Sequence, residues 1–395
     1  MTMAAGSIGR LPVPEVLAHA DRLARTGGPS VPQGARELAD LPVTGPAEVL
    51  GISRNAAERH GALLLSSGGT TGEPKLTFVP HHQAVERLSA RWRPLVPGSI
   101  MLNAFNAGRM WASHYYMQRL AEHSGATVIP FGPLTAEDAM AWAPRLARIG
   151  VTAVAGTPTG LADLAEGVLA AGAELPVKTV IWMAEPWTDT KRDAVTRAFP
   201  QAGFWGNYGS VETYVIAVND PRCDPAVLHL LPEQVLEPDD GGALLTRVGE
   251  GWTVPVVRYR LGDRVAPAEC RCGRGDGLRV LGRADDMVKF RGATFGIGEV
   301  LDVVRSVPGV TEAQLGLAGA DGDRRTAERL TVRFLGTADA EDVTAELLRA
   351  FDRFRQVMSH HPKAVTAVRA ERLARIDRTT KVPPATWSKW SEEDR

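Results

Sequence analysis

Short apolar runs alternate with amphipathic segments through the middle of the chain. The apolar runs have the length of strands and end in turn residues, whereas the segments between them repeat their apolar positions with helical spacing. The strand-like runs cover 126–132, 151–158, 178–184 and 202–209, and the helical segments cover 135–150, 159–174 and 188–199. This order predicts an α/β fold with a doubly wound, mostly parallel sheet, in which ligands bind at the carboxyl ends of the strands.

An apolar run at 62–67 leads into a stretch rich in glycine and hydroxyl groups, Ser66–Lys75. Residues 81–92 then repeat their apolar positions with helical spacing. A strand, a loop and a helix in this order predict a phosphate-binding loop, because glycines allow close approach of the backbone and hydroxyls donate to phosphate oxygens. The alternative is an ordinary turn of glycine and serine.

The chain changes character twice after residue 210. From about 215 to 283 short strands and turns predominate, which predicts a small β-rich subdomain within a large N-terminal domain, 1–283. Residues 284–395 then mix helical and strand-like patterns, with one long helix expected at 340–358, and predict a small, mobile α+β C-terminal domain.

Composition and charge narrow the classes of partner. The 395 residues carry 45 basic and 46 acidic side chains, a net charge of -1, so no overall field favours nucleic acid or an anionic membrane. No apolar run approaches the ~18 residues of a membrane-spanning helix, and the N-terminus lacks the charged and apolar segments of a signal peptide. We therefore expect a cytoplasmic protein with no nucleic acid and no membrane partner.

Three further short stretches carry side chains suited to nucleotide binding. Ala184–Trp187 and Asn207–Glu212 each follow a predicted strand, and in the second an aromatic ring beside a glycine turn can stack on a purine. The Glu212 carboxylate can hold Mg²⁺, a cation that prefers oxygen ligands. In Arg258–Asp263 one aspartate offers two acceptor oxygens to the two hydroxyls of a ribose. The alternative is that the aromatic ring belongs to the core and the aspartate to a surface turn.

Two more stretches, Leu281–Gly292 and Leu373–Val382, complete an ordered set. In order and spacing the set resembles the adenylate-forming superfamily of acyl-CoA synthetases, adenylation domains and luciferases, over about residues 60–385. Within this superfamily the chain is most similar to phenylacetate–CoA ligase, through the sequences AEPW, VVRYRLGD, CRCGR, VLGRADDMV and FGIGEV. It is also similar to short aryl-acid adenylating enzymes of antibiotic pathways, including phenazine biosynthesis.

The resemblance implies a role for each matching residue. Glu212 would position Mg²⁺, Lys381 would be the catalytic lysine, and Asp285 would be the hinge on which the small domain turns. The other matching residues would bind ATP: Ser67, Gly68, Thr70, Thr71, Gly72, Lys75, Glu185, Pro186, Asn207, Tyr208, Gly209, Ser210, Asp263 and Arg283.

Residues 103–117 lie where the superfamily places part of its acyl pocket. Aromatic rings together with amides suit a flat, substituted aryl acid better than a long aliphatic chain. The candidate pocket residues are Asn103, Phe105, Asn106, Trp111, His114, Tyr115 and Trp205. The alternative for each of them is ordinary core packing.

All three cysteines fall in the predicted β-rich subdomain. Cys223, Cys270 and Cys272, together with His229, supply three thiolates and one imidazole, which form a complete tetrahedral shell for Zn²⁺. We predict a structural zinc site away from the chemistry. The alternative is three buried, reduced cysteines.

The leading hypothesis is an ATP- and Mg²⁺-dependent ligase. It would convert a carboxylic acid, expected to be aromatic, to its acyl-AMP and then transfer the acyl group to CoA or to the thiol of a carrier protein. In a second hypothesis the reaction stops at the adenylate, or the adenylate passes to an amine, another nitrogen nucleophile or a downstream enzyme. A third is a catalytically silent nucleotide-binding homologue, although the presence of Glu212, Asp263 and Lys381 argues against silence. A homodimer is compatible with the resemblance.

Overall fold

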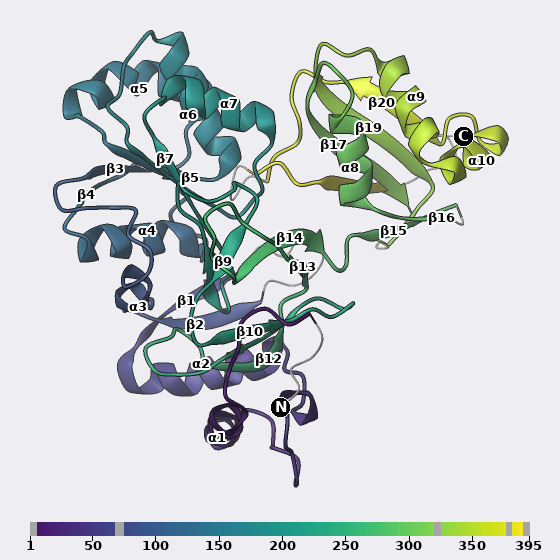
Figure 1. The fold of residues 1–395 in the computed structure, drawn as a ribbon. Coiled ribbons are helices and arrows are strands. Elements are labelled where there is room, and N and C mark those ends of the chain that lie inside the picture. The colour runs from purple at the N-terminus through teal and green to yellow at the C-terminus, as the bar shows by residue number, and fades with distance from the viewer. Residues whose placement is uncertain (1–5, 68–74, 292, 320–324, 377–380, 390–395) are drawn as a thin grey trace. The chain divides into compact units, whose positions relative to one another are not determined.

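The computed structural model describes residues 6–67, 75–291, 293–319, 325–376 and 381–389. The chain divides into two compact units, Met1–Arg283 and Ala284–Arg395, which are described separately (Figure 1). In the described part of the chain, no helix combines the length and the apolar character that crossing a bilayer requires.

A nine-stranded sheet forms the centre of the first unit. Its order is β13 (Asp263–Pro267), β14 (Gly277–Arg283), β9 (Leu228–Leu230), β8 (Tyr214–Val218), β7 (Gly203–Ser210), β6 (Thr179–Met183), β5 (Ala153–Gly156), β3 (Ile100–Asn103) and β4 (Thr127–Pro130). The strands from β7 to β4 pair in parallel, and those from β7 to β13 pair antiparallel. The α/β fold class is confirmed, but the sheet is mixed where the sequence predicts a mostly parallel one, because strands beyond residue 213 extend it.

Helices cover both faces of the parallel half of this sheet. On one face lie α5 (Ala136–Ile149), α6 (Pro158–Ala170) and α7 (Asp189–Ala198), and on the other α4 (Ala112–His123) and the short α3 (Val85–Ser89) (Figure 1). Successive residues of β6 alternate between two cores: Val180 packs in the cluster under α5–α7, and Ile181 packs in the cluster with α4. Burial on both faces explains why these strands are continuous apolar runs.

A second, three-stranded sheet is formed by β10 (Gln234–Glu237), β11 (Leu244–Arg247) and β12 (Val256–Arg260). Helices α1 (Val13–Ala24) and α2 (Pro46–His60) share its hydrophobic core, and a 3-10 turn spans Leu38–Asp40. The region expected to be one β-rich subdomain therefore divides its strands between this sheet and the central one.

The glycine-rich stretch lies between two hairpin strands rather than between a strand and a helix. β1 (Ala62–Ser66) pairs antiparallel with β2 (Leu76–Pro80), and the helix that follows spans only Val85–Ser89. The prediction of a strand, a loop and a helix is wrong here because residues 76–80 alternate in burial and form a strand that it did not include. Residues 68–74 lie outside the described part of the chain.

The second unit is an α+β module with its own core. A four-stranded sheet has the order β20 (Val365–Arg369), β19 (Arg329–Gly336), β17 (Val310–Gly319) and β21 (Ala385–Lys389), and a three-stranded sheet the order β16 (Ala293–Gly296), β15 (Met287–Phe290) and β18 (Thr326–Ala327). Its helices are α8 (Ile297–Arg305), α9 (Ala340–Ala350) and α10 (Asp352–His360). The single helix expected at 340–358 is two helices, because Phe351 has an extended backbone (φ −123°, ψ 92°).

Candidate active site

Glu212 lies in the turn between β7 and β8 and is buried, with 2% of its surface exposed. Its Oε1 accepts a hydrogen bond from the Tyr259 hydroxyl (3.1 Å) and lies 3.3 Å from Lys75 Nζ. Its Oε2 is buried and has no hydrogen-bond partner among the described residues. An ionised carboxylate is costly to bury with an oxygen unsatisfied, so this oxygen is suited to a further cation.

Lys75 precedes Glu212 in the sequence and Tyr259 follows it, and both contact its carboxylate. Lys75 immediately precedes β2, and the β1–β2 hairpin therefore brings its ammonium to the carboxylate. Tyr259 lies on β12 and is 1% exposed; it falls inside the predicted stretch Arg258–Asp263, but the sequence predicted no role for it. Tyr259 occupies a buried position in the burial pattern of β12, and that pattern is known only once the strand has been placed in its sheet.

Tyr208, Asp263 and Arg283 meet at the antiparallel side of β7. The Tyr208 hydroxyl donates to Asp263 Oδ2 (2.8 Å), and Arg283 NH1 lies 3.4 Å from Asp263 Oδ1. Asp263 and Arg283 are direct cross-strand partners in β13 and β14. Burial, and then the Asp263 carboxylate, raise the pKa of Tyr208 well above its ordinary value. Tyr208 therefore stays neutral and donates a hydrogen bond to Asp263.

The turn that carries Glu212 requires glycine at position 209. A Cβ there would lie 1.8 Å from the carbonyl oxygen of Tyr214, so no larger residue fits. Ser210 Oγ accepts the N–H of Thr213 (3.2 Å). Gly209 and Ser210, expected as nucleotide contacts, thus also shape the turn.

Glu185 follows the end of β6 by two residues, and Asn207 lies on the adjacent parallel strand β7, opposite Met183. Glu185 Oε1 accepts the N–H of Thr159 (2.7 Å) at the start of α6, so it also stabilises that helix terminus. Asn207 is 6% exposed, and its Nδ2 has no hydrogen-bond partner among the described residues. Pro186 is exposed.

The glycine-rich stretch is described only at its two ends. The Ser67 N–H donates to the Lys75 carbonyl (3.0 Å), and the Lys75 N–H donates to Ser67 Oγ (3.3 Å). The other four predicted phosphate ligands lie outside the described residues: Gly68, Thr70, Thr71 and Gly72. Asp285 and Lys381 belong to the second unit, where Asp285 is exposed and Lys381 half-buried.

Three of the predicted pocket residues bond to one another. Asn103 donates to the His114 carbonyl (3.1 Å) and accepts the Phe105 N–H (3.2 Å), while His114 Nδ1 donates to the Phe105 carbonyl (2.8 Å). All three are buried. The remaining candidates are Trp111, which is buried, and Asn106, Tyr115 and Trp205, which are half-buried.

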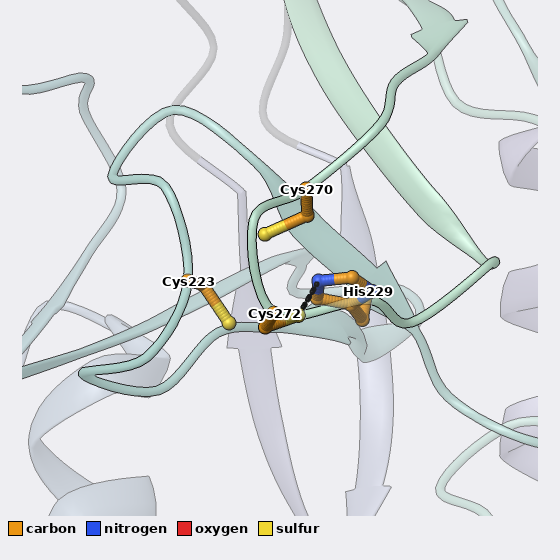
Figure 2. A group of neighbouring side chains, drawn as sticks. All are labelled: Cys223, His229, Cys270 and Cys272. Carbon is orange, nitrogen blue, oxygen red and sulfur yellow. Dashed lines mark hydrogen bonds between the residues drawn. The ribbon is translucent and has the colours of Figure 1, made fainter.

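The cysteines and His229 form a cluster in which all four ligand atoms lie within 4.8 Å of one another (Figure 2). His229 Nε2 faces Cys272 Sγ at 3.2 Å. Tetrahedral zinc thiolates place their sulfurs about 3.8 Å apart, so a small contraction would complete the shell. The donor set and its geometry therefore fit Zn²⁺.

A second layer of polar groups surrounds the cluster. Asp276 accepts from His229 Nδ1 (2.8 Å), which leaves Nε2 as the ligand atom. Arg274 donates to Cys223 Sγ (2.8 Å), and the Asp224 N–H donates to Cys270 Sγ (3.3 Å). Burial raises the pKa of the Cys223 thiol to about 11. The sequence predicted the four clustered residues as zinc ligands but did not include Arg274 or Asp276.

Comparisons with known proteins agree on one family. The model of the family described as "AMP-binding enzyme" matches residues 13–265. Indoleacetate–lysine synthetase of Pseudomonas savastanoi is 23% identical over 267 residues, which span 65% of this chain and 66% of that protein. Phenylacetate–coenzyme A ligase of Thermus thermophilus is 25% identical over 360 residues, which span 82% of this chain and 75% of that protein.

Solved structures share the fold at low sequence identity. A 2-hydroxyisobutyryl-CoA ligase in a postadenylation state superposes with a TM-score of 0.65 and 17% identity, over 95% of this chain and 85% of that chain. ATP-bound MatB from Rhodopseudomonas palustris superposes with a TM-score of 0.58 and 17% identity, over 80% of this chain and 65% of that chain.

Proposed function

The chain belongs to the AMP-binding enzyme family of ATP-dependent adenylating ligases, and we propose that it activates an aromatic carboxylic acid as its acyl-AMP and transfers the acyl group to CoA. The family confirms the superfamily that the sequence predicts. Two of the relatives are named as CoA ligases of aromatic acids, phenylacetate and hydroxybenzoate, and this supports both the acid and the acceptor.

The observation that carries the proposal is the buried Glu212 carboxylate. Its Oε1 lies beside Lys75, and its Oε2 has no hydrogen-bond partner among the described residues. The residues fit Mg²⁺, which would offset the charge of the triphosphate and of the departing pyrophosphate when bound. Lys75 is at present the cation on the other oxygen of this carboxylate. When the metal is bound, Glu212 Oε2 would hold it, and Lys75, on the other oxygen, would be placed to contact a phosphate.

The nucleoside is assigned to the group of Tyr208, Asp263 and Arg283. Tyr208 and Arg283 hold the Asp263 carboxylate in place, and its two oxygens are the kind of acceptors that the two hydroxyls of a ribose require. The unpartnered amide of Asn207, next to Tyr208 on β7, is a donor for the acid or its adenylate.

The chemistry proceeds in two displacements. A carboxylate oxygen of the acid attacks the α-phosphorus, the bond to the bridging oxygen breaks, and pyrophosphate leaves. A thiol then attacks the acyl carbonyl, AMP leaves, and the thiol proton is released. Both reactants of the first step are anions, so positioned cations such as Lys381 supply the catalysis.

A nitrogen acceptor is the second candidate function. It is favoured by the similarity to a synthetase named for indoleacetate and lysine, in which an acid is joined to an amine-bearing partner. A carrier-protein thiol is a further acceptor with the same chemistry as CoA. Acceptor choice does not alter the first half-reaction.

Aromatic acids are expected to support exchange of labelled pyrophosphate into ATP, and to yield hydroxamates with hydroxylamine, more strongly than aliphatic acids of similar size. A panel of both classes tests the first half-reaction. Product mass spectrometry with CoA, with lysine and with neither then identifies the acceptor. If no acid supports exchange, the proposed activity is wrong; if only aliphatic acids do, the aromatic assignment is wrong.

We also propose that Cys223, His229, Cys270 and Cys272 bind one Zn²⁺ as a structural site. Zinc would link the loop after β8 to β9 and to the β13–β14 loop, since these elements carry the ligands. Binding to a site that exists only in the folded chain adds its free energy to folding.

Protein purified without added zinc is expected to contain about one Zn²⁺ per chain. His229→Ala should lose most of the metal and lower the Tm by ~5–10 °C, because several kcal/mol of metal-linked stability are lost. Asp276→Ala should weaken zinc affinity about 10–100-fold by releasing the imidazole. His123→Ala, on the exposed end of α4, is the matched control and should retain the metal. Wild-type protein with only traces of metal would exclude the site.

A further inference from the structure

Arg247, the last residue of β11, is completely buried, with 0% of its surface exposed. Its Nε donates to Gln234 Oε1 (2.8 Å), NH1 to the Thr213 carbonyl (2.5 Å) and NH2 to the Val215 carbonyl (3.0 Å). Within the described part of the chain, no carboxylate pairs with it. Burial lowers the pKa of Arg247 to about 9, which leaves the guanidinium charged at neutral pH.

A buried cation without a counterion is costly, and here only dipoles and one ring offset the cost. The guanidinium lies 4.3 Å from the centroid of the Trp252 ring, and its hydrogen-bond acceptors are two carbonyls and an amide. An apolar side chain would fill the same space without this cost. The arginine is therefore expected to act by fixing the groups that accept its hydrogen bonds, and not by adding to the stability of the fold.

The two carbonyl acceptors belong to the turn that carries Glu212 and to the start of β8. Thr213 follows Glu212 directly, and Val215 is two residues further, on the other side of Tyr214, whose backbone is left-handed (φ +57°). The β7–β8 ladder is also irregular between Tyr208 and Gly209. An irregular backbone leaves carbonyl groups without hydrogen bonds to the neighbouring strand, so a side-chain donor must provide those hydrogen bonds.

We propose that Arg247 is a positioning residue for adenylation, which fixes residues 213–215 and through them the orientation of Glu212 toward the metal. The inference rests on the proposed function, in which Glu212 holds Mg²⁺. Arg247 does not touch Glu212, and its effect passes through the backbone of one adjacent residue.

Gln234 reinforces this arrangement from behind. It is the direct cross-strand partner of Arg247, and its Nε2 donates to the carbonyls of Ile216 (2.9 Å) and Leu231 (3.2 Å). The Arg247 guanidinium is thus held at a strand that is itself bonded to β8. A flexible cation at this position would not fix the turn.

Arg87 provides a matched control. Its guanidinium also lies over the Trp252 ring, 4.7 Å from the centroid, but it pairs with Glu233 and, within the described part of the chain, donates no hydrogen bond to residues 213–215. Arg87→Met removes a similar amount of cation–ring contact as Arg247→Met without removing a donor to the turn.

The test is the Mg²⁺ dependence of acid-dependent pyrophosphate exchange. Arg247→Met is expected to raise the Mg²⁺ concentration for half-maximal exchange by about 10–100-fold, as loss of an outer-shell partner does. Arg247→Lys keeps the charge but only some of the guanidinium's hydrogen-bond donors. Its Mg²⁺ concentration for half-maximal exchange should lie between those of the wild-type protein and Arg247→Met. Arg87→Met should keep the wild-type dependence.

A double-mutant cycle separates positioning from stability alone. In a Glu212→Gln background, Arg247→Met should change the Mg²⁺ dependence by less than about twofold, because both changes act on one ligand. A purely structural role predicts equal losses of Tm and of exchange in both backgrounds, with no shift in Mg²⁺ dependence, and this result would overturn the inference. If Arg247→Met does not fold, an unshifted Arg247→Lys has the same meaning. Absence of exchange in the wild-type protein with every acid would instead overturn the proposed function.

Discussion

Replacing Lys381 with alanine is expected to lower the rate of acid-dependent pyrophosphate exchange by about 10²–10³, the usual effect of removing one preorganised donor from a charged transition state. The reason is electrostatic. The carboxylate and the α-phosphate are both anions, and their approach requires a cation that is held in place. ATP binding should change much less than the exchange rate.

The structure of the second unit supports a defined position for this lysine. The Lys381 carbonyl accepts the N–H of Ile376 (2.8 Å). Buried Gln314 accepts the Ala374 N–H (3.0 Å) and donates to the Ala374 (3.0 Å) and Pro383 (2.8 Å) carbonyls. Residues on both sides of Lys381 are therefore fixed to β17.

Lys363→Ala is the matched control for this variant, because Lys363 is an exposed lysine of the same unit. It should exchange pyrophosphate at the wild-type rate. An unchanged rate in Lys381→Ala, measured at saturating ATP and acid, would remove Lys381 from the mechanism.

Glu212→Gln is the second variant with a large expected effect. The amide keeps the shape of the side chain and its contact with Tyr259 but removes the negative charge that faces Lys75 and the proposed metal. Loss of an anionic magnesium ligand costs several kcal/mol of transition-state stabilisation, so exchange should fall by about 10²–10³. Titration of the rate with Mg²⁺ should show a matching rise in the concentration required.

Two variants define what the charge contributes. Tyr259→Phe removes only a neutral donor to the same carboxylate, and it should raise the activation free energy of exchange by about 0.5–1.5 kcal/mol. Glu233→Gln removes a half-exposed carboxylate that pairs with Arg87 and should have no effect on Mg²⁺ dependence. A Glu212→Gln enzyme with wild-type rate and Mg²⁺ dependence would show that this carboxylate does not hold the metal.

Local patterns predicted the α/β fold class, the family and the enzyme class, and these are confirmed. Period and capping are local properties, so the helix after Thr135 could be read directly; its side chain accepts the Asp138 N–H (3.1 Å). The β1–β2 hairpin could not, because strand pairing depends on a partner and not on the segment alone.

The contacts of the candidate site were harder to predict than its members. Glu212 and Tyr259 are 47 residues apart, and only the placement of β12 brings them together. Arg247 lies in no recognisable sequence motif, and its proposed role follows only from the two carbonyls that accept its hydrogen bonds in the structure. Cysteine counting predicted the four residues that the structure brings together, but the partner of His229 depends on the exact pairing of β14 with β9.

The β13–β14 hairpin has different chemistry at its two ends. Its loop carries Cys270 and Cys272, and its open end pairs Asp263 with Arg283. The side-chain period of a strand is two, so a slip of one residue in this hairpin would turn one member of that pair to the opposite face of the sheet. With zinc bound at its loop, the hairpin would be held in this register, and the register determines whether Asp263 and Arg283 share one face of the sheet.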